Sequence, residues 1–132
     1  MSAENVEVIR ATYEAFSKGD IPGVLGRFAN EIVWNEAENF LYADRNPYVG
    51  PQAILEGVFM RIVSEWDNFK VTAESILDAG DQVVTLGFYS GTFKQTGKSV
   101  KAQMVHVWNL VDGKATSFQQ YTDTKQFADA VA

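Results

Sequence analysis

The first third of the chain has apolar residues at helical spacing. They recur every three or four positions over residues 6–16, and Gly19 follows as a helix stop. Asp20 can cap a second, short helix with its side chain. A third helix opens at Gly50-Pro51, and its apolar face is predicted to run as far as Trp66. The sequence therefore predicts helices first.

The period changes near residue 30. Apolar and polar residues alternate over residues 32–36, which predicts a strand. Residues 37–50 have no clear period and are predicted to form a loop, although this loop is too apolar to be simply solvated. Long alternating segments then follow from Phe69 to about Thr122. Helices followed by a meander of strands indicate an α+β domain, with the helices on one face of a curved antiparallel sheet.

Two details of the strands bear on the shape of this sheet. Gly87 and Gly91 lie inside one predicted strand, where glycine favours a bend or a bulge. Asp112-Gly113 is a hairpin signal between the last two strands. A two-residue loop there would pair His106 with Gln119, and a three-residue loop would pair it with Gln120. Both registers stay open at this point.

Composition narrows the chemistry that is available. The 132 residues carry 17 acidic and 11 basic side chains, a net charge of −6, with one histidine and no cysteine. Disulfides, thiolate nucleophiles, cysteine-zinc sites and multi-histidine metal sites are therefore excluded within one chain. The acidic balance and scattered basic residues argue against nucleic-acid binding. Neither a signal peptide nor a membrane-spanning run is present, so a single domain over residues 1–132 in the cytoplasm is expected.

Glu36 is the first candidate for chemistry. It shares a strand face with Ile32 and Trp34, so its carboxylate continues an apolar row. If that row is buried, desolvation raises the pKa of Glu36 and makes it a plausible general base or acid. The alternative is that Glu36 ends the strand and reaches solvent.

His106 is the second candidate. It lies between Met104 and Trp108 on an otherwise apolar strand face. Histidine is the side chain whose ordinary pKa allows proton transfer in both directions near neutrality. The alternative is a buried histidine that one hydrogen bond satisfies. Trp34 and Trp108 each share a face with a candidate acid or base, which is typical of an aromatic-walled pocket, whereas the spacing at Asp123 indicates a helix cap.

The order of these parts resembles a known superfamily. The resemblance rests on residues 16–20, 28–34, 48–54, 106–114 and 120–123. Together they resemble the nuclear-transport-factor-2-like (NTF2-like) superfamily, in the branch of the ketosteroid isomerases and the SnoaL-like polyketide cyclases. The resemblance implies a cone-shaped α+β fold, with helices on a strongly curved, mixed but mostly antiparallel sheet that encloses a deep apolar cavity. It also implies a homodimer formed through the sheet.

The resemblance assigns expectations to single residues. Glu36 falls where the isomerases have an aspartate base, and Thr12 where they have an oxyanion-hole tyrosine that Tyr13 could replace. His106 falls where the isomerases have a protonated aspartate and where the cyclases have an active-site histidine. Gln120 stands where the cyclases have a catalytic aspartate, and this alignment favours the three-residue hairpin loop. The expected substrate-binding residues are Thr12, Tyr13, Phe16, Trp34, Met104, Trp108 and Gln120.

These expectations lead to one hypothesis and two alternatives. The leading hypothesis is an enzyme acting on a small apolar molecule with a carbonyl or an enolisable carbon. Glu36 would move the proton and His106, helped by Gln120, would polarise the oxygen, with no metal or organic cofactor. The first alternative is a non-catalytic ligand-binding or dimeric interaction module of the same fold. A hydrolase of the epoxide type ranks lower, because no arginine is obviously placed to join two carboxylates.

Overall fold

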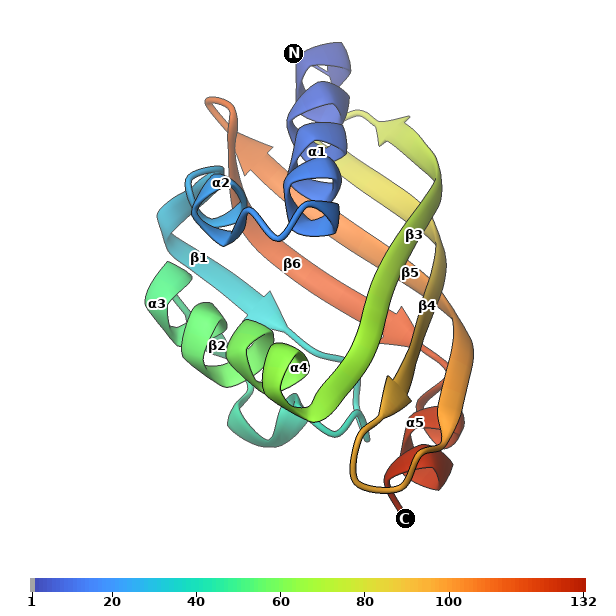
Figure 1. The fold of residues 1–132 in the computed structure, drawn as a ribbon. Coiled ribbons are helices and arrows are strands. Elements are labelled where there is room, and N and C mark those ends of the chain that lie inside the picture. Colours follow the sequence, from blue (N-terminus) through green and yellow to red (C-terminus); the bar gives the residue numbers. More distant parts are fainter. Residues whose placement is uncertain (1) are drawn as a thin grey trace.

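A six-stranded sheet forms the body of the protein in the computed structural model, which describes residues 2–132 (Figure 1). The strand order is β2-β1-β6-β5-β4-β3, and neighbours are antiparallel except for β1 and β6, which are parallel. The strands are β1 (Phe28–Asn35), β2 (Tyr48–Val49), β3 (Trp66–Ala79), β4 (Gln82–Phe93), β5 (Ser99–Val111) and β6 (Lys114–Thr122).

The helices cover the concave side of this sheet. Figure 1 shows the first four helical segments in front of the sheet and the last one at the far end of β4 and β5. They are α1 (Ser2–Ser17), α2 (Ile21–Leu25), α3 (Pro51–Ile54), α4 (Met60–Glu65) and α5 (Thr124–Val131). The predicted α+β fold, with helices on a curved, mixed but mostly antiparallel sheet, is confirmed. No helix within residues 2–132 has the length and apolar character needed to cross a membrane.

The boundary between α1 and α2 follows the sequence signals. Gly19 has a φ of 71°, a left-handed conformation that suits glycine and ends α1. The carboxylate of Asp20 accepts a hydrogen bond of 3.0 Å from the backbone N–H of Gly23, which caps α2. Both predictions are confirmed.

The predicted third helix contains a π-helical turn and ends earlier than expected. Residues 51–65 run through α3, the π-turn η2 (Leu55–Phe59) and α4. Trp66 does not end this helix, because it is the first residue of β3, where it pairs with Phe93 and is buried. Helical spacing could not separate the two elements, since an apolar residue at position 66 fits the end of one and the start of the other.

The apolar segment predicted as a loop contains two short elements of regular secondary structure. It contains the 3₁₀ turn η1 (Ala43–Arg45) and the short strand β2, whose Tyr48 pairs with Trp34. Phe40, Tyr42 and Tyr48 are buried, so the segment closes the core instead of lying in solvent. Its apolar content was the informative signal, because burying these rings outweighs the cost of ordering the backbone.

Glycines in β4 accompany the bends of the sheet. The register between β3 and β4 shifts between Ala73 and Ser75, opposite Gly87, and a second shift lies opposite Gly91. A Cβ at Gly87 would lie 1.8 Å from the carbonyl oxygen of Thr72, so no larger residue fits there. The predicted irregularities at both glycines are confirmed, and such bulges increase the local twist of a strand.

The β5–β6 hairpin settles the register question with a feature that was not predicted. Asp112 and Gly113 have φ values of 51° and 76°, as in a two-residue type I′ turn, so the expected three-residue loop is wrong. A bulge at Thr116 then shifts the pairing by one residue, because it adds an unpaired residue to β6. His106 therefore pairs with Gln120. This is the pairing expected for a three-residue loop, although the loop itself has two residues.

Candidate functional site

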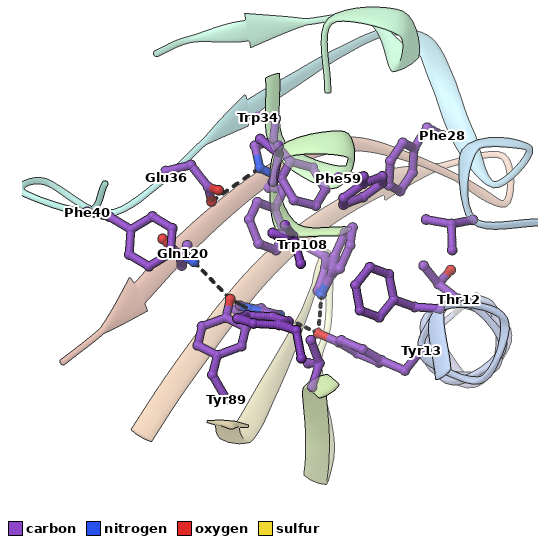
Figure 2. A pocket seen from close by; sticks show the side chains of 18 residues that line it. Thr12, Tyr13, Phe28, Trp34, Glu36, Phe40, Phe59, Tyr89, Trp108 and Gln120 are labelled. Atoms are coloured by element: carbon purple, nitrogen blue, oxygen red, sulfur yellow. Dashed lines mark hydrogen bonds between the residues drawn. The ribbon is translucent and has the colours of Figure 1, made fainter. Parts of the chain in front are cut away.

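A cavity of about 60 Å³ lies between the helices and the concave face of the sheet. Its lining is almost entirely apolar and aromatic, as Figure 2 shows. The structure brings eight of the predicted site residues to this one cavity: Thr12, Tyr13, Phe16, Trp34, Glu36, His106, Trp108 and Gln120.

Two predicted residues have other surroundings than expected. Met104 is buried on the same face of β5 but is not among the residues that line the cavity, and its terminal methyl group lies near Gly87. Thr12 lines the cavity, yet its hydroxyl donates a 2.8 Å hydrogen bond to the carbonyl oxygen of Val8 in its own helix. The single hydroxyl hydrogen of Thr12 is therefore used within α1.

Glu36 is held at the end of β1 by its backbone and its carboxylate. Asn46 clamps the backbone, since its side chain accepts from the N–H of Glu36 at 3.0 Å and donates to the carbonyl oxygen of Glu36 at 2.8 Å. The indole N–H of Trp34 donates to Glu36 Oε2 at 3.3 Å (Figure 2). Burial raises the pKa of Glu36 from 4.5 to about 8, opposed by the Trp34 hydrogen bond and the positive charge of Arg61.

His106 has a tyrosine hydroxyl at each ring nitrogen. Tyr13 Oη lies 2.7 Å from Nδ1, and Tyr89 Oη lies 2.5 Å from Nε2. Burial lowers the pKa of His106 from 6.5 to about 3, so the imidazole is neutral at neutral pH. Because both nitrogens already have hydrogen-bond partners, His106 has no free nitrogen with which to contact a ligand.

Two further donors complete this group. The indole N–H of Trp108 donates to Tyr13 Oη at 3.0 Å, and the side-chain amide of Gln120 donates to Tyr89 Oη at 2.9 Å. Gln120 Oε1 in turn accepts from the backbone N–H of Ala37 at 3.0 Å, which fixes the amide orientation. We call Tyr13, His106, Tyr89, Trp108 and Gln120 the polar cluster. Burial raises the pKa of Tyr13 and of Tyr89, so both phenols are neutral.

Two polar residues of β4 were missed by sequence reasoning. Thr85 is fully buried directly opposite His106, and Tyr89 lies farther along the same face of β4. The buried hydroxyl of Thr85 lies beside Tyr13, and its side-chain hydrogen bond lowers the pKa of Tyr13. The signal was available, because Thr85 and Tyr89 share strand parity with the buried Val83, as His106 does with Met104.

Aromatic rings make the rest of the wall. Trp34 stacks on Phe118 with ring centroids 3.6 Å apart, and Trp108 packs against Phe118 at 4.7 Å. Phe59 packs edge-on against Trp34 from the π-turn. Such a wall excludes water and leaves shape and the few polar groups to determine which molecule fits.

Neither Asp123 nor any metal-ligand group belongs to the site. Asp123 is exposed and is the N-cap residue of α5, as expected, but its side chain makes no capping hydrogen bond to the backbone. Its carboxylate accepts instead from the side chain of Gln126 at 3.0 Å. In the described part of the chain, histidine, aspartate and glutamate side chains form no group of three that could hold a metal ion.

The curved sheet, the covering helices and the cavity between them define an NTF2-like domain. The model of the SnoaL-like domain matches residues 9–118, and the chain belongs to that family. An NTF2-like protein from Burkholderia thailandensis is 34% identical over 97% of both chains, with a TM-score of 0.92. No match was found among curated proteins.

Two further solved structures extend the comparison. TerC, co-crystallized with polyporic acid, is 26% identical, with 97% of this chain and 98% of TerC covered and a TM-score of 0.86. A putative SnoaL-like polyketide cyclase from Shewanella denitrificans is 17% identical over 96% of both chains, with a TM-score of 0.74. The latter likeness concerns the fold alone.

Proposed function

We propose that the cavity binds a small apolar molecule with a carbonyl group or an enolisable carbon and that Glu36 transfers a proton to or from it. The observation that carries this proposal is the placement of one buried carboxyl group and one cluster of neutral donors in the same apolar cavity. Isomerisation, cyclisation and related eliminations all need a proton moved at carbon and a negative charge stabilised at oxygen.

Glu36 suits the proton-transfer step. A pKa of about 8 lies close to neutral pH, so the carboxyl group can give up and recover a proton at small cost. The clamp by Asn46 and the hydrogen bond from Trp34 limit the positions that the carboxylate can adopt. A positioned base or acid of matched pKa contributes about a hundredfold to ten-thousandfold to a rate.

The polar cluster suits the oxygen atom of the ligand. Since His106 is neutral and both its nitrogens are bonded, a tyrosine hydroxyl is the better donor to a developing oxyanion. A neutral donor in a dry site stabilises such a charge strongly because no water has to reorganise. The TerC structure, co-crystallized with polyporic acid, supports the idea that this type of fold accepts a small organic acid.

The test is turnover of a panel of enones and polyketide-like ketones. Glu36→Gln removes the titratable group and keeps the shape, so we expect a loss of about a hundredfold or more in kcat. Glu38→Gln is the matched control, because Glu38 is an exposed glutamate two residues away. Turnover by the native protein that Glu36→Gln leaves unchanged would overturn the role of Glu36.

A non-catalytic binding module is the second candidate function. It is favoured by the small free volume and by the close packing of the rings around it. Tight binding of a ligand from the panel without any turnover would establish it. No arginine lines the cavity within residues 2–132, which gives the epoxide-hydrolase alternative no support.

We also propose a homodimer formed through the outer face of the sheet. Leu86 is 39% exposed on that face of β4, and the half-buried Val105 pairs with it from β5. A Leu86→Arg variant should be monomeric at concentrations where the native protein sediments as a dimer. A native protein that sediments as a monomer at high concentration contradicts this proposal.

A further inference from the structure

The chain of contacts from Tyr13 through His106 to Tyr89 has one hydrogen more than it needs. Each tyrosine has one hydroxyl hydrogen, and a neutral imidazole has one N–H. The contacts at Nδ1 and Nε2 use one hydrogen each. One hydroxyl hydrogen is therefore always left outside these two contacts.

The tautomer of His106 decides which hydrogen is left. With the proton on Nε2, His106 donates to Tyr89 and accepts from Tyr13, so the hydrogen of Tyr89 is free. With the proton on Nδ1 the roles are exchanged, and the hydrogen of Tyr13 is free. Trp108 and Gln120 do not alter this, because both donate to the phenol oxygens from outside.

The two ends of this chain have different surroundings. The Tyr89 end is tied through Gln120 to the backbone of Ala37, the residue next to Glu36. The Tyr13 end borders the buried hydroxyl of Thr85, whose side-chain hydrogen bond lowers the pKa of Tyr13 against the larger effect of burial.

Tyr13 also lines a second, outer pocket that includes Arg10, Glu14 and Glu74. The free hydrogen is thus at one of two places in the main cavity, at Tyr89 near the backbone next to Glu36 or at Tyr13 beside Thr85.

We propose that His106 is a neutral tautomer switch that directs one tyrosine hydroxyl hydrogen, from Tyr13 or from Tyr89, to an acceptor oxygen of the ligand. This proposal rests on the proposed function, since it assumes that a ligand occupies the cavity. It adds that the ligand binds through a carbonyl or anionic oxygen. This oxygen accepts a hydrogen bond from either Tyr13 or Tyr89.

Histidine labelling tests the switch directly. His106 is the only histidine in the chain, so ¹⁵N-labelled histidine gives a single pair of ring signals whose shifts report charge and tautomer. Tyr13→Phe should place the proton on Nε2, because the nearest remaining donor on the other side is the indole N–H of Trp108. Tyr89→Phe should place it on Nδ1, because the amide of Gln120 then faces Nε2 as a donor.

The matched control is Tyr121→Phe, since Tyr121 is exposed on β6 and does not line the cavity. Its spectrum should equal that of the native protein. The same tautomer in Tyr13→Phe and in Tyr89→Phe, or a charged imidazole at neutral pH, would overturn the switch.

Binding of two probes tests the ligand class. Acetophenone has an acceptor oxygen and ethylbenzene has none, although their shapes are similar. We expect each single variant to keep its preference for acetophenone. The double variant Tyr13→Phe/Tyr89→Phe should bind acetophenone about three- to tenfold more weakly than the native protein does. Equal binding of acetophenone by the native protein and the double variant would overturn the donor role.

The outcomes separate this proposal from the proposed function. Opposite tautomers in the two single variants, combined with no binding of acetophenone or of any ketone in the panel, would overturn the proposed function and the delivery of the hydrogen to a ligand. Only the control of the His106 tautomer by Tyr13 and Tyr89 would then stand. Turnover of a ketone by the native protein, combined with the same tautomer in Tyr13→Phe and Tyr89→Phe, would support the proposed function and overturn the switch.

Discussion

The two ends of the cavity respond to burial in opposite directions. At one end the pKa of Glu36 is raised to about 8, and at the other the pKa of His106 is lowered to about 3. The physical cause is the same, because desolvation disfavours the charged form of either group. Both groups are therefore neutral at pH 7, and an apolar cavity contains two titratable residues without containing a charge.

The hydrogen bonds make the two ends unequal. Glu36 receives one long hydrogen bond from Trp34, whereas His106 has a hydroxyl at each nitrogen. Ionising Glu36 at pH 7 costs about 1 kcal/mol, and protonating His106 costs about 5 kcal/mol, given one and four pKa units. The proposed proton transfer therefore fits the carboxyl end, whereas the histidine end has hydrogen bonds without charge.

The largest expected effect is on stability at high pH. Between pH 4.5 and 8 the unfolded chain has lost the Glu36 proton and the folded chain retains it, so the contribution of Glu36 to the free energy of unfolding falls as pH rises through this range. Below about pH 6.5 the opposite contribution of His106 offsets it, so the net decline is expected between pH 6.5 and 8. The loss contributed by Glu36 approaches about 5 kcal/mol above pH 8. Urea unfolding between pH 6.5 and 8 isolates this contribution: the native protein and Glu38→Gln should lose stability as pH rises, and Glu36→Gln should not. A parallel decline in Glu36→Gln contradicts the burial of the carboxyl group.

A mirror-image effect is expected at low pH. Between pH 6.5 and 3 the unfolded chain binds a proton at His106 and the folded chain does not, so the contribution of His106 to stability falls as pH decreases. The net fall is expected below about pH 4.5, where Glu36 is protonated in both states. At about pH 4 the contribution is about 3 kcal/mol. In His106→Gln the change in the free energy of unfolding between pH 6.5 and 4 should differ from that of the native protein by this amount, whatever the absolute stability of the variant. An unchanged slope means that His106 titrates normally.

A smaller change should shift the pKa of Glu36 without altering the hydrogen bonds of His106. Trp34→Phe removes the N–H that favours the ionised Glu36, so the pKa of Glu36 should rise by about one unit, since hydrogen bonds to charged groups contribute about 1.5–3 kcal/mol. The pH at which the alkaline decline in stability levels off marks the pKa of Glu36 in the folded chain and measures this shift. Trp66→Phe is the control, because Trp66 is buried and its indole donates to Tyr42 instead. A shift of equal size in both variants would point to general loosening of the core.

Sequence patterns predicted the fold well because most elements carry local signals. The stop at Gly19, the cap at Asp20 and the alternation of β5 were each readable from adjacent residues. The predictions were wrong where a contact between distant residues determines the secondary structure. The apolar Trp66 fits the pattern of a helix or of a strand equally well, and its pairing with Phe93 places it in β3. The short strand β2 forms because Tyr48 pairs with Trp34 of β1.

The candidate site was predictable to a lesser extent. Strand parity predicted that Glu36 and His106 share faces with apolar residues, and both side chains are buried. Parity could not show that Tyr13 and Tyr89 occupy both nitrogens of His106, because those contacts join α1, β4 and β5 at a separation of 93 and 17 residues. The bulge at Thr116 has no sequence signal of its own, yet it decides that Gln120 faces inward.

The bulge also explains how the two ends are connected, which leads to the smallest expected effect. Gln120 bridges them, accepting from the backbone beside Glu36 and donating to Tyr89. Gln120→Met keeps the length of the side chain but removes both hydrogen bonds, so the protein should lose about 1–3 kcal/mol of stability and Tyr89 should lose its fixed donor. Gln119→Met is the matched control, because the half-buried Gln119 makes only a local contact to the carbonyl oxygen of Gln120. Thermal unfolding measures the loss of stability, and the ¹⁵N signals of His106 should respond to Gln120→Met alone. If Gln119→Met perturbs those signals instead, then the register without the bulge holds in solution, and the connection between the two ends runs through Gln119.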